Sequence, residues 1–179
     1  SLTKSGLKHF NEFAVSVTKK FNLSSKDLVI DIGSNVGILL NFFKKNKVKI
    51  LGVDPAYNIC KIANKRGIKT ISNFFDNSTV TKIKKKYGNA KIITGTNVFA
   101  HIDDLKSLFK NVSKVLDYKK GVFIVEVPHF LNLINDLEYD TIYHEHLSYI
   151  TIIPLIKFLK TINFQIIDIE KKDIHGGSI

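Results

Sequence analysis

Short apolar runs alternate along this chain with longer segments in which apolar residues recur every three or four positions. That spacing between Phe10 and Phe21 predicts a first helix from about Thr3 to Phe21. The short runs predict strands at residues 28–32, 49–53, 68–71, 91–94, 122–127 and 164–169. The longer segments predict helices at residues 37–45, 56–65, 78–87, 103–116 and 148–162. This alternation favours an α/β fold with a doubly wound, mostly parallel sheet and helices on both of its faces.

The C-terminal third departs from this regular alternation. The nearly unbroken apolar run at 122–127 predicts a strand buried on both faces, and Pro128 ends it because proline cannot donate to a ladder. A polar, irregular stretch is expected at 129–146, and Gly176 and Gly177 would turn the chain toward a seventh strand that is mostly missing. We expect one domain over residues 1–179. Because the chain contains no methionine and stops soon after the glycine pair, we expect it to be a segment of a longer protein.

The composition is that of a soluble globular protein, with 44% hydrophobic and 24% charged residues. The sequence has no apolar run suited to crossing a bilayer and no cleavable leader, so we expect a cytoplasmic location and no membrane partner. Cys60 is the only cysteine, which excludes an intramolecular disulfide and a cysteine zinc knuckle. We expect it to be a buried thiol on a helix.

The net charge of +11 suits an anionic partner, such as nucleic acid, a membrane surface or a phosphorylated small molecule. Proteins that read nucleic acid rely on arginine, however, and Arg66 is the only arginine in this chain. The lysines stand mainly in short groups, such as 84–86, on expected outer helix faces. We therefore favour a compositional bias of the source over a nucleic-acid footprint as the explanation.

A glycine loop at 29–37 joins the first strand to its helix. Gly33 allows a tight turn and a close approach to a ligand, and ligands of such sheets bind at the carboxyl ends of the strands. Asp54 follows the second strand, where its carboxylate can accept hydrogen bonds from both hydroxyls of an adenosine ribose. A nicotinamide dinucleotide needs a glycine where Asn35 stands, and Asp31 would repel its pyrophosphate. An acid at position 31 instead favours the cationic aminoacyl sulfonium of S-adenosyl-L-methionine, which is the cofactor that we predict.

Other strand ends supply further candidates for the cofactor site. Asn73, Phe74 and Phe75 follow the third strand and could flank the adenine, although core packing of the two phenylalanines is an equal alternative. Asn97 and Ala100 follow the fourth strand, at positions that face the ligand crevice. The full set of predicted cofactor-binding residues is Asp31, Gly33, Ser34, Asn35, Gly37, Asp54, Pro55, Asn73, Phe74, Phe75, Asn97 and Ala100.

Chemistry-bearing side chains gather after the fifth strand, in the segment Tyr143-His144-Glu145-His146. Histidine titrates near neutral pH and a tyrosine hydroxyl can stabilise an oxyanion, so the segment suggests proton transfer. His101 is a further candidate, although it could equally be a helix-entry residue. A zinc site is disfavoured because HxH lacks a third ligand, and a polar loop cross-linked by its own hydrogen bonds is the structural alternative. We predict catalytic roles for His146, Tyr143, Glu145 and His101, and no metal.

Four segments of the chain resemble the sugar C-methyltransferases that act on nucleotide-linked 4-keto-deoxysugars. They lie at residues 97–102, 126–128, 140–149 and 175–178, and the resemblance covers essentially the whole chain. It implies a Rossmann-like class I methyltransferase domain that uses S-adenosyl-L-methionine and a nucleotide-diphosphate sugar, with a catalytic cluster at Tyr143, Glu145 and His146. Members of that family also carry an N-terminal cysteine-rich zinc domain and a C-terminal Rossmann-like domain. The resemblance therefore implies that this chain is a central domain.

The implied reaction is methylation, through an enolate, of the carbon next to the ketone, which we expect to be C3. The ketone acidifies the proton on that carbon, His146 removes it, and Tyr143 hydrogen-bonds to the enolate oxygen. Glu145 would orient the histidine or hold a sugar hydroxyl. His144 is the rival base if the loop is extended, whereas a helical turn would align Tyr143 with His146. Two other functions stay open: methylation of another acceptor, such as RNA or a small-molecule oxygen, and a non-catalytic module that binds the cofactor.

Overall fold

A computed structural model describes residues 3–174 and 176–179 of the chain. The chain forms two compact units. Unit 1 comprises the residues up to Thr94 together with Asn111–Ile124, and unit 2 comprises Gly95–Lys110 together with Val125–Ile179. The three boundaries between the units fall within two strands and one helix. Each unit therefore contains parts of the same α/β fold.

Five strands form one sheet in the order β3-β2-β1-β4-β5. The strands are β1 (Leu28–Ile32), β2 (Lys49–Asp54), β3 (Thr70–Ser72), β4 (Ile92–Thr96) and β5 (Val122–Glu126). β1 pairs in parallel with β2 and β4, and β2 pairs in parallel with β3, which confirms the predicted α/β fold. Ile32 of β1 and Val53 of β2 are register partners, so these two strands end side by side. The loops that follow them therefore meet at one edge of the sheet.

The central and outer strands differ in burial. Every residue of β1 is buried, as expected for a strand between two neighbours. β5 stands last in the strand order, and four of its five residues are only half-buried. The prediction that this strand is buried on both faces is therefore wrong, because an apolar run does not reveal whether its strand is central or outermost.

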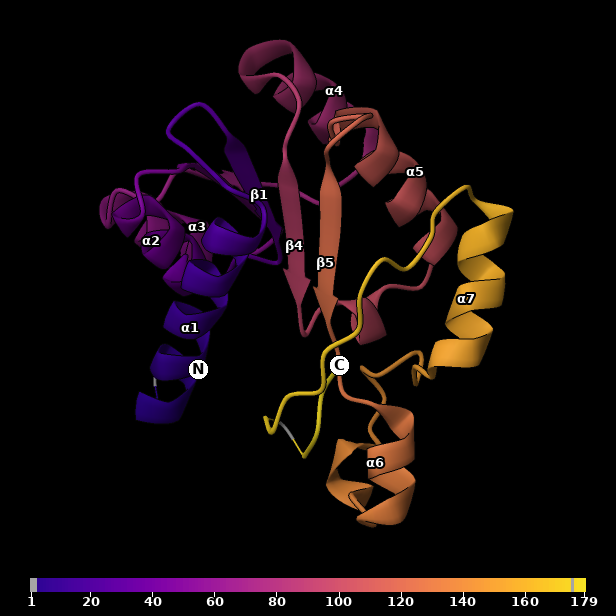
Figure 1. Cartoon of the computed structure of the whole chain (residues 1–179). Coiled ribbons are helices and arrows are strands. Elements are labelled where there is room, and N and C mark those ends of the chain that lie inside the picture. Colours follow the sequence, from indigo (N-terminus) through magenta and orange to yellow (C-terminus); the bar gives the residue numbers. More distant parts are fainter. Residues whose placement is uncertain (1–2, 175) are drawn as a thin grey trace. The chain divides into compact units, whose positions relative to one another are not determined.

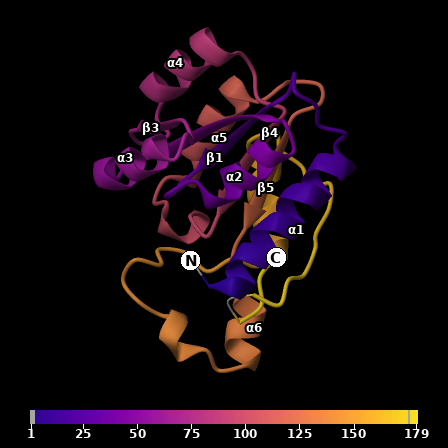
Figure 2. The same cartoon turned by 90° about the vertical axis from the view of Figure 1, so that its left-hand side faces the viewer.

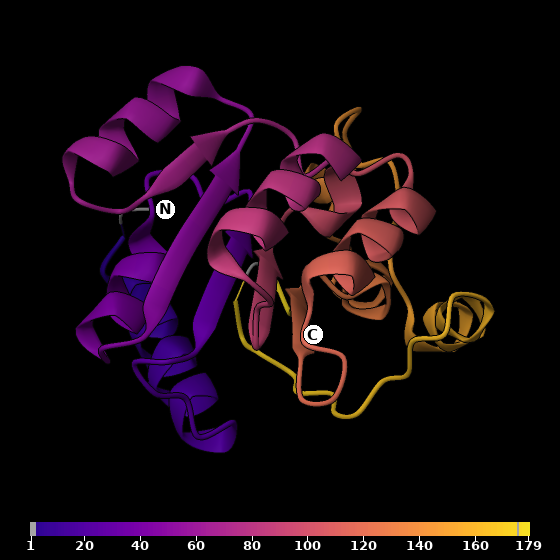
Figure 3. The same ribbon diagram turned by 90° about the horizontal axis from the view of Figure 1, so that it is seen from above.

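Helices cover the strands of unit 1. They are α1 (Lys4–Lys20), α2 (Ile38–Lys45), α3 (Tyr57–Lys65) and α4 (Asn77–Tyr87). Ala14 of α1 and Phe43 of α2 are fully buried with Val29 of β1 in one apolar cluster. Figure 3 shows α1 and α2, in indigo and purple, on one side of these strands and α4, in magenta, on the other. Figure 2 shows α1 from its outer side. The two-sided arrangement agrees with the predicted doubly wound sheet.

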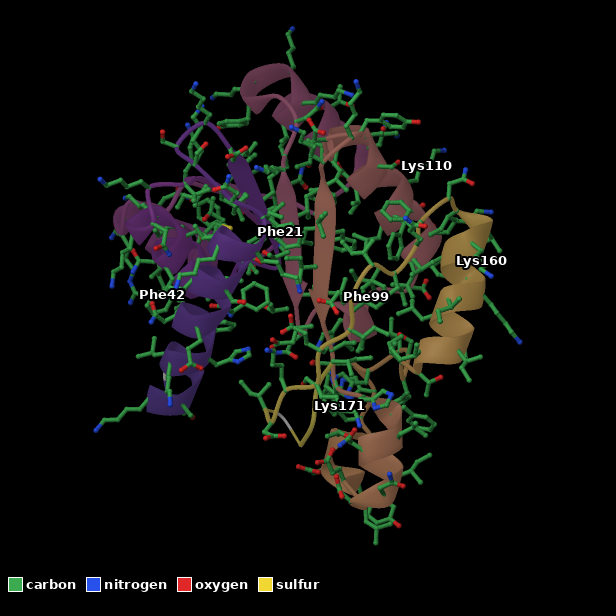
Figure 4. The ribbon with its side chains drawn as sticks, in the orientation of Figure 1. Phe21, Phe42, Phe99, Lys110, Lys160 and Lys171 are labelled. Atoms are coloured by element: carbon green, nitrogen blue, oxygen red, sulfur yellow. The ribbon has the colours of Figure 1, made fainter. Side chains whose placement is uncertain are left out.

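Unit 2 has an aromatic core of its own. Its elements are η1 (Phe99–His101), α6 (Phe130–Asn135), η2 (Tyr139–Thr141) and α7 (Ile152–Thr161), and it includes the first residues of α5 (Leu105–Val115). The Phe109 ring meets Phe99, Phe158 and Phe164 edge-on, with centroid distances of 5.7, 5.8 and 4.9 Å. Phe99, which Figure 4 labels, is almost completely buried. These contacts fix η1 and α7 around α5.

The predicted strand at 164–169 is wrong. Within that described range no residue joins a strand. Phe164 instead packs on Phe109, and its backbone N–H donates to the Leu159 carbonyl at the end of α7. Ile167 and Ile169 are exposed. An alternating apolar pattern predicts a strand only if a neighbouring strand is there to pair with it, and the described residues supply none.

Two other boundaries in the C-terminal third also differ from expectation. The stretch 129–146, expected to be irregular, contains α6 and η2. The following helix begins at Ile152 rather than near residue 148. Ile150 forms an isolated β-bridge with His129, and its carbonyl accepts the backbone N–H of Phe130.

The third strand begins at Thr70 rather than at residue 68, because the Ile68 N–H still donates to the Ala63 carbonyl in the turn that closes α3.

The glycine turn near the C-terminus brings the chain back to the end of β5, as Figure 1 shows. Val127 and Ile179 exchange two backbone hydrogen bonds of 3.0 Å in antiparallel fashion. A Cβ atom at Gly176, where φ is 73°, would overlap the carboxylate of Glu138, so a larger residue would force that side chain to move. His175 lies outside the described residues. In the described part of the chain, no helix is long and apolar enough to cross a membrane.

Candidate active site

The glycine loop of unit 1 is tied closely to β2. Gly33 has a φ of 68°, and its N–H donates to the Val53 carbonyl at 2.8 Å. Gly37 has a φ of 78° at the start of α2, and a Cβ there would lie 2.5 Å from Cγ2 of Ile68. Both the left-handed backbone and the lack of space therefore require glycine at position 37. The loop leaves its backbone close to the carboxyl ends of β1 and β2, where such sheets bind ligands.

Asp54 links this loop to the end of β2. Its Oδ2 accepts the backbone N–H of Asn35 at 2.9 Å, and its Oδ1 accepts the N–H of Ala56 at 2.9 Å. The side chain is only 8% exposed. Each carboxylate oxygen keeps a second lone pair, so the group can also accept hydrogen bonds from a ligand hydroxyl. The carboxylate thus has a structural role in the loop that sequence reasoning did not predict.

Asp31 is a buried acid in the middle of β1. Burial raises the pKa of its carboxyl to about 7, the Thr94 hydroxyl that donates to Oδ1 at 2.6 Å opposes this shift, and the negative charge of Asp54 adds to it. The side chain is 3% exposed. A cation bound nearby would favour the ionised form, so this acid fits a positively charged ligand better than a pyrophosphate.

The Ser34 side chain points into the sheet rather than toward a ligand. Its Oγ is buried and has no hydrogen-bond partner among the described residues. A Cβ at Gly52 would collide with this Oγ and would lie 2.7 Å from Oγ1 of Thr70. The absence of a side chain at Gly52 therefore leaves the space that the Ser34 side chain occupies. Only the backbone of Ser34 stays available for the predicted cofactor contact, and its N–H already donates to Val53 at 3.3 Å.

The two phenylalanines after β3 differ in exposure. Phe74 is 69% exposed, so packing in the core does not explain it. Phe75 is half-buried, and its carbonyl accepts a hydrogen bond from Nδ2 of Asn111. The Asn73 N–H donates to the Asp54 carbonyl at 3.0 Å. Pro55, the residue that follows Asp54, is exposed. Unit 1 thus holds ten of the twelve predicted cofactor-binding residues on three adjacent strand ends.

Asn97 and Ala100, the other two predicted cofactor-binding residues, lie in unit 2. Asn97 has a φ of 56°, and its N–H donates to the Glu126 carbonyl at 2.9 Å. Its Oδ1 is buried without a hydrogen-bond partner among the described residues. The Ala100 carbonyl accepts the N–H of Leu147 at 2.8 Å. Ala100 therefore anchors the loop that carries the candidate catalytic residues.

Tyr143 and His146 form a hydrogen-bonded pair in unit 2. The Tyr143 hydroxyl lies 3.0 Å from Nε2 of His146, and the two ring centroids are 4.2 Å apart. The His146 N–H donates to the Tyr143 carbonyl at 3.0 Å, which closes a turn between them. On the other side of the ring, Nδ1 of His146 lies 2.8 Å from the Thr141 carbonyl oxygen. The turn brings Tyr143 and His146 together, as expected for the helical alternative.

His101 lies beside this pair. Its ring centroid is 4.9 Å from that of His146, and its Nδ1 lies 2.9 Å from the Glu145 carbonyl oxygen. The histidine therefore holds the loop through the Glu145 backbone. The side chains of Glu145 and His144 are exposed. The structure thus brings together three of the four predicted catalytic side chains, with Glu145 contributing its carbonyl.

A small cavity borders His146. It also involves residues that sequence reasoning did not single out, among them His129 at the end of β5, whose Nδ1 lies 3.1 Å from Oδ1 of Asn132. The position of His129 after a strand could have identified it. The cavity is lined by Ala100, Val127, Pro128, His129, Phe130, Leu133, Thr141, His146, Ser148 and Tyr149. Across residues 3–174 and 176–179, no group of three or more His, Cys, Asp or Glu side chains could hold a metal ion.

Known proteins similar to this chain agree with its fold. A family model described as a methyltransferase domain matches residues 8–169. The chain is 34% identical over 173 residues, 97% of its length, to the C-methyltransferase NovU of Streptomyces niveus, and it spans 41% of that protein. Among solved structures it resembles magnesium protoporphyrin IX methyltransferase of Synechocystis with bound SAH, with a TM-score of 0.71, 12% identity and coverage of 97% and 80% of the two chains. It also resembles the plantazolicin methyltransferase BpumL in complex with SAH, with a TM-score of 0.67, 16% identity and coverage of 89% and 65%.

Proposed function

Because the chain belongs to the methyltransferase domain family, we propose that it methylates the carbon next to the ketone of a nucleotide-linked 4-keto-deoxysugar. The observation that carries this proposal is the Tyr143–His146 pair, an oxygen acid and a ring base within 3.0 Å. Such a pair suits removal of a proton from the carbon that is to be methylated. The name of NovU, a C-methyltransferase, supports the same type of reaction.

The methyl donor of the family is S-adenosyl-L-methionine, which supplies an electrophilic methyl group when bound. The residues of unit 1 fit this donor. Asp54, with free lone pairs at the end of β2, would hold the ribose hydroxyls, and the backbone around Gly33 would lie against the ligand. Asp31 would favour its positive charge. Oδ1 of Asn97 in unit 2 is buried without a partner among the described residues, so it is suited to accept a hydrogen bond from a ligand.

In unit 2 we propose that His146 is the base that becomes protonated when the substrate carbon loses its proton. The ketone makes the neighbouring C–H acidic, and loss of its proton places negative charge on the ketone oxygen. Once the proton has left the carbon, the Tyr143 hydroxyl is suited to donate a hydrogen bond to that oxygen. Glu145, whose carboxylate is exposed, would hold a sugar hydroxyl. His101 would keep the loop in place through the Glu145 carbonyl.

Charge along the sequence restricts where the diphosphate of such a substrate is held. Residues 121–156, which include the whole Tyr143–His146 loop, contain five carboxylates and no lysine or arginine. This segment cannot neutralise a diphosphate, so we propose that it receives the sugar ring alone. The 27 basic residues outside it are the source of cations for the phosphates. We also propose a cytoplasmic location, where both nucleotide sugars and the methyl donor are available.

Mass spectrometry of products from a panel of nucleoside-diphosphate 4-keto-deoxysugars tests the function. The expected result is the gain of one methyl group on carbon, with no product from His146→Gln. Methylation of RNA or of a sugar hydroxyl in place of carbon would contradict the proposal. A gel shift at two salt concentrations provides the check on RNA. Binding that persists at the higher salt concentration would favour RNA as the acceptor, whereas binding that is lost there reflects only the net charge of the chain.

A further inference from the structure

The hydrogen bond to Thr141 fixes which nitrogen of His146 carries a proton. Nδ1 lies 2.8 Å from the Thr141 carbonyl oxygen, which can only accept. A proton must therefore stand on Nδ1, because the other tautomer would direct a nitrogen lone pair at a carbonyl lone pair. In neutral His146 the lone pair is consequently on Nε2.

That lone pair is already engaged. The Tyr143 hydroxyl lies 3.0 Å from Nε2, and with no proton on Nε2 the hydroxyl must be the donor. Both ring nitrogens of His146 thus have hydrogen-bond partners in the protein. Tyr143 is 42% exposed, whereas His146 is half-buried. The accessible basic atom of the pair is therefore the Tyr143 oxygen.

We infer that Tyr143 takes the proton from the substrate carbon and passes its own proton to His146. This inference rests on the proposed function. As the C–H bond breaks, its electron pair forms a C=C bond to the ketone carbon and the C=O π pair moves to the oxygen. The carbon-bound proton forms a new O–H bond with Tyr143, and the former hydroxyl proton moves to Nε2. Tyr143 ends neutral and His146 ends as an imidazolium. Its Nδ1 proton remains hydrogen-bonded to the Thr141 carbonyl. The imidazolium later releases one proton to solvent.

Further hydrogen bonds fix the position of the loop that carries Tyr143 and His146. Two hydrogen bonds, from Leu147 N–H to the Ala100 carbonyl and from His101 Nδ1 to the Glu145 carbonyl, fasten the C-terminal end of the loop to η1. Because His101 also donates through Nδ1, its own lone pair is on Nε2. His101 is thus a positioning residue that keeps the loop fixed while the charge on His146 changes.

Proton abstraction can be followed by release of tritium from a thymidine-diphosphate 4-keto-6-deoxyhexose labelled next to the ketone, with S-adenosylhomocysteine present. Tyr143→Phe and His146→Gln should each slow this release by about a hundredfold or more, and the double variant should be no slower than either. Tyr139→Phe, the same change on a neighbouring exposed tyrosine, is the control and should release tritium normally. Release should also be slower in heavy water, because the hydroxyl proton moves in the same step.

The outcomes separate the relay from the function. No release by the unsubstituted protein would contradict the proposed function. Release that survives Tyr143→Phe but not His146→Gln would overturn the relay and leave the function standing, with His146 acting directly. Nitrogen NMR of the His146 ring gives a second readout that needs no substrate. It should find the proton on Nδ1 and a changed Nε2 resonance in Tyr143→Phe, whereas a proton on Nε2 would overturn the relay.

Discussion

The carboxylate of Asp54 accepts the backbone N–H of Asn35, 19 positions earlier in the chain, at 2.9 Å. One side chain thus closes the glycine loop and also presents oxygen lone pairs at the end of β2. Loop geometry and ligand binding consequently depend on the same group.

Asp54→Ala should weaken binding of S-adenosylhomocysteine by about 1–3 kcal/mol, since it leaves polar groups without partners. It should also lower stability, because the N–H groups of Asn35 and Ala56 lose their acceptor. Calorimetry measures the first effect and urea unfolding the second. Asp76→Ala is the matched control, because it removes the cap of α4 at a cost of about 1 kcal/mol in stability but should leave affinity unchanged. Unchanged affinity in folded Asp54→Ala would rule out the ribose role.

Asp31 should make stability fall as the pH rises. Its pKa is raised from 3.8 to about 7 in the folded protein, so between those values the folded state binds more proton than the unfolded state. The resulting loss of stability is complete above pH 7 and amounts to at most about 4 kcal/mol. Asp31→Asn, which keeps an acceptor for Thr94, should remove this slope. Urea unfolding at pH 5 and pH 8.5 checks it, and equal slopes in both proteins would show that Asp31 is ionised throughout.

His146→Gln should abolish exchange of the hydrogen next to the ketone in heavy water while cofactor affinity stays nearly intact. His144→Gln should slow the exchange much less, because the turn pairs Tyr143 with His146 and leaves the His144 side chain exposed. Proton NMR of the keto sugar with S-adenosylhomocysteine measures both rates. Normal exchange by His146→Gln would move the role of base to Glu145 or His101.

The 179-residue chain should bind cofactor yet turn over slowly. Its cofactor loops are complete, whereas it spans only 41% of NovU, and we propose that the zinc domain and C-terminal domain of the sugar C-methyltransferases help to hold the sugar nucleotide. Turnover of a nucleoside-diphosphate keto sugar should rise at least tenfold in a fusion that supplies the parts of NovU outside the region matched by this chain. A chain that alone matches the fusion would show that the methyltransferase domain suffices.

The sequence predicted the parallel sheet and the glycine loop because both depend on local features. Apolar runs mark strands such as β1, and a left-handed turn at Gly33 needs no distant partner to be anticipated. The strand expected at 164–169 failed for the opposite reason, since pairing depends on a neighbour and Phe164 packs on Phe109 instead.

In the candidate site, the spacing of Tyr143 and His146 allowed their contact to be foreseen as one of two alternatives. The acceptor for Nδ1 of His146 is the backbone carbonyl of Thr141, and every residue has such a carbonyl. No residue type therefore signals this contact in a sequence. The same holds for the bond from His101 to the Glu145 carbonyl.

The close approach of Ser34 and Gly52 has a consequence for how this domain tolerates change. A Cβ at position 52 would lie 3.1 Å from the Ser34 Cβ and closer still to its Oγ, so the two positions compete for one space. Gly52 has no positive φ, so space alone restricts it. Among homologous chains, a side chain at 52 should therefore appear only where positions 34 and 70 both have smaller residues, and position 52 should covary with position 34 although 18 positions separate them in sequence.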